Sequence, residues 1–203
     1  MRDPLSSSRS SSGSRGDNRV RIIGGRWRGR KLQFPDSEGL RPTGDRIRET
    51  LFNWLMPVLP GAHCLDLFAG SGVLGFEALS RGAADCVFLE RHSQVVRYLE
   101  QTKQILAAEH ATILRADSLQ WLATAAGIFD IVFIDPPFAD KSVSPAAIVR
   151  TLQETGRLAA DPWIYIEQSA ADTHALTEDF MPYRQQRAGQ VSYSLWRKVE
   201  NTL

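Results

Sequence analysis

The fold of this chain is decided by residues 64–75, whose sequence is CLDLFAGSGVLG. A short apolar run passes into three glycines, Gly70, Gly72 and Gly75, which have the spacing G-x-G-x-x-G. Glycines in this pattern permit a tight turn between a strand and a helix, and they let backbone N–H groups approach a bound nucleotide closely. The stretch therefore predicts a strand, a turn and a helix that bind a nucleoside-containing cofactor.

An acid at the end of the next apolar run supports this prediction. Residues 86–89 are apolar, and Glu90 follows them about 20 residues after the glycine turn, where a ribose-binding carboxylate is expected. Asp66 stands four residues before Gly70 and indicates which cofactor is bound. Its negative charge would repel the pyrophosphate of a dinucleotide but suits the ammonium of a methionine moiety. We therefore expect S-adenosylmethionine rather than NAD.

Two further segments complete the expected cofactor site. Asp117 follows the strand-like residues 112–114 and is suited to accept a hydrogen bond from an adenine amine. A helix N-cap is the compatible alternative, because residues 118–122 read as a helix. Residues 41–55 predict another helix with Thr43 as N-cap, whose first turn and Arg46 face the cofactor carboxylate, although Arg46 and Arg48 equally suit a solvated surface. The expected cofactor residues are Asp66, Phe68, Gly70, Gly72, Glu90, Asp117, Ser118, Thr43 and Arg46.

A second motif, Asp135-Pro136-Pro137-Phe138, closes the apolar residues 131–134. Proline fixes its own φ and restricts the residue before it, so this turn is stiff, and open α/β sheets bind ligands at the carboxyl ends of their strands. The turn suits chemistry on a planar NH2 group, because a carboxylate and a backbone carbonyl accept its hydrogens while an aromatic ring stacks on the base. Alone, the motif fits an ordinary Asp-Pro turn equally well. Beside the glycine turn, it predicts Asp135, Pro136 and Phe138 as catalytic residues without a metal.

Length and composition indicate one globular enzyme domain. The chain has 203 residues, of which 43% are hydrophobic and 23% charged. No segment approaches the ~18 uninterrupted apolar residues that a membrane span needs, and the N-terminus has no apolar region of a secretory signal. Cys64 and Cys86 lie in predicted buried strands without metal-ligand spacing, so we expect both to be core residues. A cytoplasmic monomer is the default expectation.

The net charge of +1 hides a strong asymmetry along the chain. Residues 1–50 hold 12 Lys and Arg against 6 Asp and Glu, whereas the remainder holds 12 against 17, so the two parts carry +6 and −5. A basic leader on an acidic body indicates an anionic macromolecular partner. Guanidinium groups pair with phosphates and an indole stacks on an unpaired base, unless Trp27 packs on the core of a solvated basic strand. The expected RNA-binding residues are Arg26, Trp27, Arg28, Arg30 and Lys31.

The chain divides into three parts. Residues 1–19 are rich in Ser and Arg with almost nothing apolar, which predicts a disordered arm. Residues 20–40 predict a small basic hairpin that contacts RNA, with a first strand near residues 21–23. Residues 41–200 alternate between strand and helix patterns as a doubly wound α/β domain does, and they end in an antiparallel hairpin.

Taken together, these motifs resemble the class I S-adenosylmethionine-dependent methyltransferases. More narrowly, the chain resembles the RsmD-type bacterial 16S rRNA guanine-N2 methyltransferases over residues 20–197. The glycine turn and the Asp-Pro-Pro-Phe motif identify only the superfamily, whereas residues 21–30 and 41–55 point to the rRNA family. The resemblance implies a Rossmann-like sheet of seven strands with the last one antiparallel, helices on both faces, and a small N-terminal hairpin. It also implies transfer of methyl to N2 of one guanine in 16S rRNA, within the small ribosomal subunit or an assembly intermediate.

Other functions remain open at this point. Asp-Pro-Pro-aromatic chemistry also serves adenine-N6 methylation of DNA or RNA. A small-molecule methyltransferase is disfavoured by the basic leader, and a dinucleotide-dependent oxidoreductase is disfavoured by Asp66. A non-catalytic RNA-binding assembly factor is the alternative from another class. It is disfavoured by four intact acids, Asp66, Glu90, Asp117 and Asp135.

Overall fold

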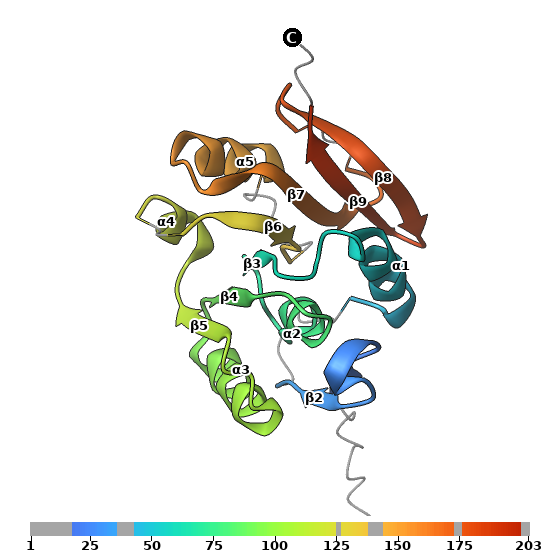
Figure 1. Ribbon diagram of the computed structural model, residues 1–203, viewed down its shortest axis with the longest axis vertical. Coiled ribbons are helices and arrows are strands. Elements are labelled where there is room, and N and C mark those ends of the chain that lie inside the picture. The colour runs from blue at the N-terminus through green and yellow to red at the C-terminus, as the bar shows by residue number, and fades with distance from the viewer. Residues whose placement is uncertain (1–17, 36–42, 125–126, 138–143, 173–175, 200–203) are drawn as a thin grey trace, which may run out of the picture.

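The computed structural model describes residues 18–35, 43–124, 127–137, 144–172 and 176–199 (Figure 1). A seven-stranded sheet has the order β5-β4-β3-β6-β7-β9-β8, and a separate two-stranded sheet pairs β1 with β2. The strands of the large sheet are β3 (His63–Asp66), β4 (Asp85–Glu90), β5 (Ala111–Arg115), β6 (Phe129–Ile134), β7 (Leu158–Ser169), β8 (Phe180–Ala188) and β9 (Val191–Lys198). The helices are α1 (Asp45–Leu55), α2 (Val73–Ser80), α3 (Ser93–Leu106), α4 (Ser118–Leu122) and α5 (Pro145–Glu154).

The strand directions confirm the expected topology. Strands β3 to β7 are parallel, and β9 lies antiparallel between β7 and β8. The chain starts the large sheet at β3 and builds outward to β4 and β5, and then returns to the other side of β3 with β6. The junction of β3 and β6 is therefore the point at which the strand order reverses, where open α/β sheets bind their ligands.

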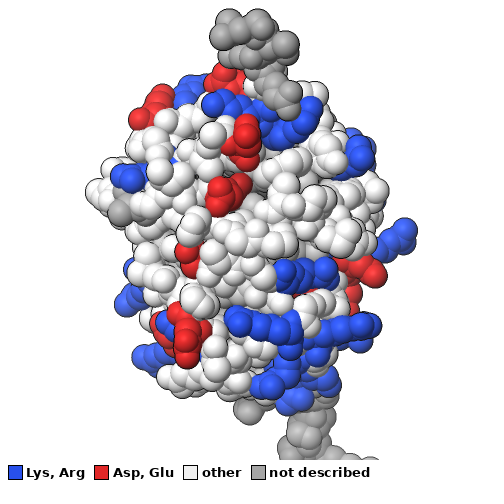
Figure 2. Space-filling view, in the orientation of Figure 1, with Lys and Arg blue, Asp and Glu red and all other residues white. Residues whose placement is uncertain are grey.

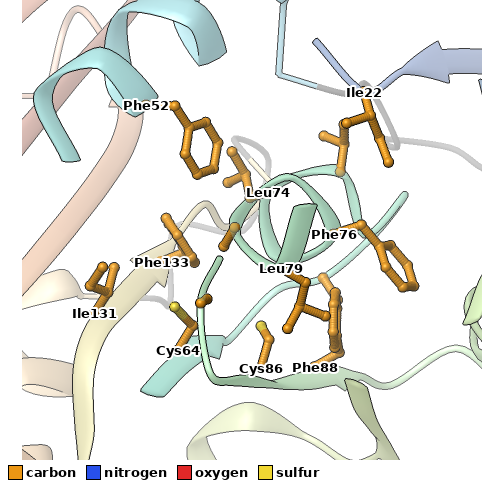
Figure 3. Packing of buried hydrophobic residues seen from close by; sticks show 14 of the residues in the cluster. Ile22, Phe52, Cys64, Leu74, Phe76, Leu79, Cys86, Phe88, Ile131 and Phe133 are labelled. Atoms are coloured by element: carbon orange, nitrogen blue, oxygen red, sulfur yellow. The ribbon is translucent and has the colours of Figure 1, made fainter. Parts of the chain in front are cut away.

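Helices cover both faces of the sheet, as expected (Figure 1). Helices α1, α2 and α3 pack on one face with Phe133 and Tyr165, whereas α4 and α5 pack on the other with Ile134 and Ile166. The change of face at each step along β6 and β7 follows from the alternation of side chains along a strand. Cys64 and Cys86 are fully buried on the face covered by α1, α2 and α3, and they form no disulfide. They are therefore confirmed as core residues (Figure 3).

Two glycines of the motif after β3, one in the turn and one in the helix, are required by the local geometry. Gly72 has a φ of 74°, a left-handed conformation that favours glycine, and it is the N-cap of α2. Gly75 lies inside α2, where an added Cβ would stand 2.3 Å from Cε1 of Phe88 on β4. Figure 3 shows Phe88 and Cys86 pointing from β4 toward α2. Glycine at position 75 therefore lets the helix lie close against the sheet.

The small N-terminal sheet forms, with its first strand two residues earlier than expected. Strand β1 (Arg19–Arg21) pairs antiparallel with β2 (Lys31–Gln33), and a short 3-10 helix, η1 (Gly25–Trp27), lies between them. The N–H of Ile23 donates to Oε2 of Glu77 on α2 at 2.8 Å, so regular pairing has already ended there. The hairpin is part of the main core, to which it contributes Val20, Ile22, Trp27 and Leu32.

Among the described residues, no helix has the length and apolar character needed to cross a membrane. Over the same ranges, no group of three or more His, Cys, Asp or Glu residues is arranged to hold a metal ion.

Candidate functional site

Four carboxylates stand in a row at the carboxyl edge of the parallel strands. Glu90 ends β4, Asp66 ends β3, Asp135 directly follows β6, and Glu167 lies near the end of β7. Ile134 is level with Ile166, so Asp135 and Glu167 are level in the next position and emerge on the same face. The row crosses the junction of β3 and β6. Two of its acids lie beside the glycine turn, and the other two lie beside the Asp-Pro-Pro turn.

The first two acids are tied to the glycine turn. The N–H of Gly70 donates to Oε2 of Glu90 at 3.2 Å, and the N–H of Gly75 donates to Oδ2 of Asp66 at 3.2 Å. Asp66 is only 1% exposed. Burial raises the pKa of Asp66 to about 7, against the hydrogen bonds from Gly75 and Phe68, which lower it. A cationic ligand at this position would restore the charged form.

Asp117 and Ser118 lie beyond the end of β5. Asp117 is the N-cap of α4, and its Oδ1 accepts from the N–H of Gln120 at 3.1 Å, which confirms the capping alternative. Its role toward an adenine amine remains a prediction. The buried hydroxyl of Ser118 donates to the carbonyl of Leu67, and this bond joins the start of α4 to the segment that follows β3.

Asp135 has a partner that the sequence did not indicate. The hydroxyl of Thr43 donates to Oδ2 of Asp135 at 3.0 Å. The expected capping role of Thr43 is wrong, because Gly44 is the N-cap of α1 and makes no side-chain cap bond. Burial and the negative charge of Glu167 raise the pKa of Asp135 well above its ordinary value. Pro136 is buried beside it, and Phe138 lies outside the described residues.

The two arginines of α1 have different environments. Arg46 is exposed on the first turn, and its contact with a cofactor carboxylate remains a prediction. Arg48 is 0% exposed, so the surface interpretation of this residue is wrong. Its guanidinium donates to the carbonyls of Thr43 and Arg21 at 3.0 and 2.9 Å and pairs with the buried Glu77 at 3.4 Å. The spacing of Arg48 and the buried Phe52, four residues apart on one helix face, was the available signal.

The hairpin carries an exposed basic surface, formed by Arg26, Arg28, Arg30 and Lys31. Figure 2 shows Lys and Arg side chains gathered at the lower end of the molecule, where Figure 1 places β2. Trp27 is only 9% exposed, and its backbone N–H donates to Oγ of Ser80 at 2.9 Å. The structure therefore shows the core-packed alternative for Trp27, whose indole is not presented for base stacking.

The residues around the glycine turn fit S-adenosylmethionine. An added Cβ at Gly72 would stand 2.5 Å from Cδ2 of Leu99 and 2.8 Å from Cε2 of Phe76, so the turn requires glycine at this position. Asp66 offers a buried carboxylate for a cation, and Glu90 offers a second one for hydroxyl groups. S-adenosylmethionine supplies an electrophilic methyl group on a positively charged sulfur.

Comparisons with known proteins agree with this fit. The profile of the family described as "Conserved hypothetical protein 95" matches residues 20–197. Ribosomal RNA small subunit methyltransferase D of Escherichia coli strain K12 is 43% identical over 184 residues, which cover 90% of this chain and 92% of the relative. The protein of the same name from Haemophilus influenzae is 44% identical over 182 residues, covering 88% and 93%. The solved structure "Putative methyltransferase yhhF from Escherichia coli" has a TM-score of 0.81 at 42% identity, covering 89% of this chain and 98% of that one.

The strand order, the glycine turn and the Asp-Pro-Pro turn define an S-adenosylmethionine-dependent methyltransferase of the class I fold. The sequence identity to these relatives, and the share of the chain that the matches cover, then define the family. The chain belongs to the family of ribosomal RNA small subunit methyltransferase D.

Proposed function

We propose that the protein transfers methyl from S-adenosylmethionine to the exocyclic N2 of one guanine in 16S rRNA. The observation that carries this proposal is Asp135, held by Thr43 at the carboxyl end of β6 and followed by the rigid Pro136, in a chain closely similar to small-subunit rRNA methyltransferases. The substrate is the cytoplasmic small ribosomal subunit or one of its assembly intermediates, and the protein acts as a monomer.

The chemistry follows from the electronics of the amino group. The lone pair of guanine N2 is delocalised into the ring, so this nitrogen is a poor nucleophile. Asp135 and the carbonyl of Pro136 accept its hydrogens, which localises the lone pair and orients it toward the methyl group. The N–C bond would form as the C–S bond breaks, and the electron pair of the C–S bond would stay on sulfur. The N–H proton passes to Asp135. Phe138 is proposed to stack on the base, which must leave its RNA loop to enter the site.

Transfer of labelled methyl to small ribosomal subunits that lack their native methylations tests this function. The labelled nucleoside is identified after complete digestion. Label in N2-methylguanosine at one site is the expected result. Label in N6-methyladenosine, or in DNA offered in the same reaction, would keep the Asp135 chemistry and contradict the guanine target.

Cofactor binding is expected to weaken in acid because of Asp66. Protonation below about pH 7 removes the charge that pairs with the ligand ammonium, so affinity for S-adenosylhomocysteine should fall about tenfold per pH unit. Calorimetric titration between pH 8 and pH 5 measures this dependence, and Asp66→Asn should bind weakly with a flat profile. The free energy of unfolding of the ligand-free protein is expected to change with pH in the opposite direction to cofactor affinity. The raised pKa of Asp66 gives a stabilising contribution that is complete below pH 3.8, and this contribution is lost as the pH rises through about 7.

RNA binding is expected to depend on the basic surface of the hairpin. The double variant Arg28→Ala/Lys31→Ala removes two exposed cations, so the slope of log affinity against log salt should decrease by about 1–2 units. Filter binding at several salt concentrations measures the slope. The matched control Arg150→Ala/Lys198→Ala removes two exposed cations from α5 and the far end of β9. Equal slopes for the two double variants would mean that the hairpin cations do not contact RNA phosphates.

A further inference from the structure

Glu167 is a buried carboxylate that the proposed mechanism does not use. It is 5% exposed, and its Oε2 accepts from the hydroxyl of Tyr165 at 2.8 Å within the same strand. The strand register places it level with Asp135 on the neighbouring strand. An acid in this position influences whether the proposed catalytic carboxylate carries a charge.

Thr43 joins the two acids. Its hydroxyl donates to Oδ2 of Asp135 at 3.0 Å, and it also lowers the pKa of Glu167. Thr43 is itself 4% exposed, and its carbonyl is held by the buried Arg48 at 3.0 Å. The single hydrogen of the hydroxyl is therefore donated to Asp135, which leaves Glu167 to its bond from Tyr165.

Electrostatics oppose a second negative charge in this cluster. Two adjacent carboxylates that are shielded from solvent titrate as a pair, because ionisation of one disfavours ionisation of the other. Burial and the charge of Glu167 raise the pKa of Asp135, the hydrogen bond from Thr43 lowers it, and the charge of Asp66 raises it further. Burial also raises the pKa of Glu167. The ionisable and hydroxyl groups around the pair are Thr43 before α1, Asp66 on β3, Tyr165 on β7 and Tyr193 on β9.

We propose that Glu167 is a positioning residue that controls the ionisation of Asp135, with the Thr43 hydroxyl as the link between them. The pair holds one proton in the resting protein and releases it to solvent before the amino group is bound. Asp135 then accepts the amino hydrogens as a carboxylate and takes the N–H proton when the N–C bond forms. Product release returns that proton to solvent, so the cycle balances. This inference rests on the proposed methyl transfer to an amino group.

Carboxyl carbon NMR on the ligand-free protein tests the paired titration without any turnover. In the wild-type protein, Asp135 should ionise well above the ordinary carboxyl range. In Glu167→Gln, which keeps the shape of the side chain and removes its charge, Asp135 should ionise about one pH unit lower or more. An unchanged titration of Asp135 overturns the proposal, and this result does not depend on the identity of the RNA substrate.

The pH profile of single-turnover methyl transfer provides a second test. The rate should fall toward acid as Asp135 takes up its proton. Glu167→Gln should move this acidic limb to lower pH, whereas Thr43→Val should move it to higher pH, because the hydrogen bond that favours the charged form is lost. Thr43→Ser keeps the hydroxyl and should restore the wild-type limb. If Glu167 had a purely structural role, Glu167→Gln would lower the rate at every pH and would not shift the acidic limb of the profile. That outcome would also overturn the proposal.

Discussion

Asp135→Asn is expected to slow methyl transfer by orders of magnitude while leaving the fold and the binding of cofactor intact. The amide keeps the size of the side chain and one oxygen for the Thr43 hydroxyl, which lies 3.0 Å from Oδ2 in the wild-type protein. It loses the negative charge that we propose to accept the amino hydrogens and the N–H proton. Loss of one general base typically reduces the rate by about 10²–10⁴-fold, and we expect a decrease in kcat of this size.

Single-turnover kinetics measure the effect, and titration with S-adenosylhomocysteine checks cofactor binding separately. Asp130→Asn is the matched control, because Asp130 lies on β6 at its amino end, whereas Asp135 follows its carboxyl end. Its carboxylate accepts from the N–H of His63 at 2.8 Å, far from the Asp-Pro-Pro turn. The control should transfer methyl at nearly the wild-type rate. Full activity of Asp135→Asn would sink the mechanism.

Arg48→Met is expected to produce the largest loss of stability. Arg48 and Glu77 are both fully buried, and removal of the arginine leaves the Glu77 carboxylate without its buried cation. Breaking such a pair typically costs about 3–5 kcal/mol, which corresponds to a decrease in Tm of roughly 6–20 °C for a chain of this size. Urea unfolding and calorimetry measure the two quantities.

Arg46→Met is the matched control on the same helix. Arg46 is exposed, so its replacement should change the free energy of unfolding by no more than about 0.5 kcal/mol. The double variant Arg48→Met/Glu77→Gln should regain part of the loss, because the buried Glu77 charge, which keeps its ion pair with Arg81 at 2.7 Å but lacks Arg48 in the single variant, is then absent. Equal effects of the two single variants would mean that the buried ion pair contributes nothing to stability.

The Arg48 network also joins the hairpin to helices of the main domain. Arg48 donates to the carbonyl of Arg21, and Glu77 accepts from the N–H of Ile23 at 2.8 Å and from Arg81 at 2.7 Å. The proposed RNA-contacting surface is therefore anchored to α1 and α2. These helices lie over the same face of the sheet as the row of carboxylates.

The sequence by itself determined the parts of the site that are local in the chain. Residues 64–75 predicted the strand, turn and helix, because glycine spacing and apolar runs act over a few residues. Glu90 was placed correctly at the end of a strand, since chain distance from the glycine turn nearly fixes its position in a parallel sheet. The number of strands and the antiparallel last strand came from the family resemblance, and the structure confirms both.

Only the tertiary structure decided which distant side chains meet. Thr43 bonds Asp135 across 92 residues of chain, and this contact replaced the local capping role that its helix pattern predicted. Packing also buried Arg48 and Trp27, whose side chains are long enough to suit either surface or core. Nothing in the sequence marked Glu167 as part of the site, and its proposed role arises from its position beside Asp135 on the neighbouring strand. A local pattern fixes which face a residue occupies, whereas its partner on that face depends on how the whole sheet is assembled.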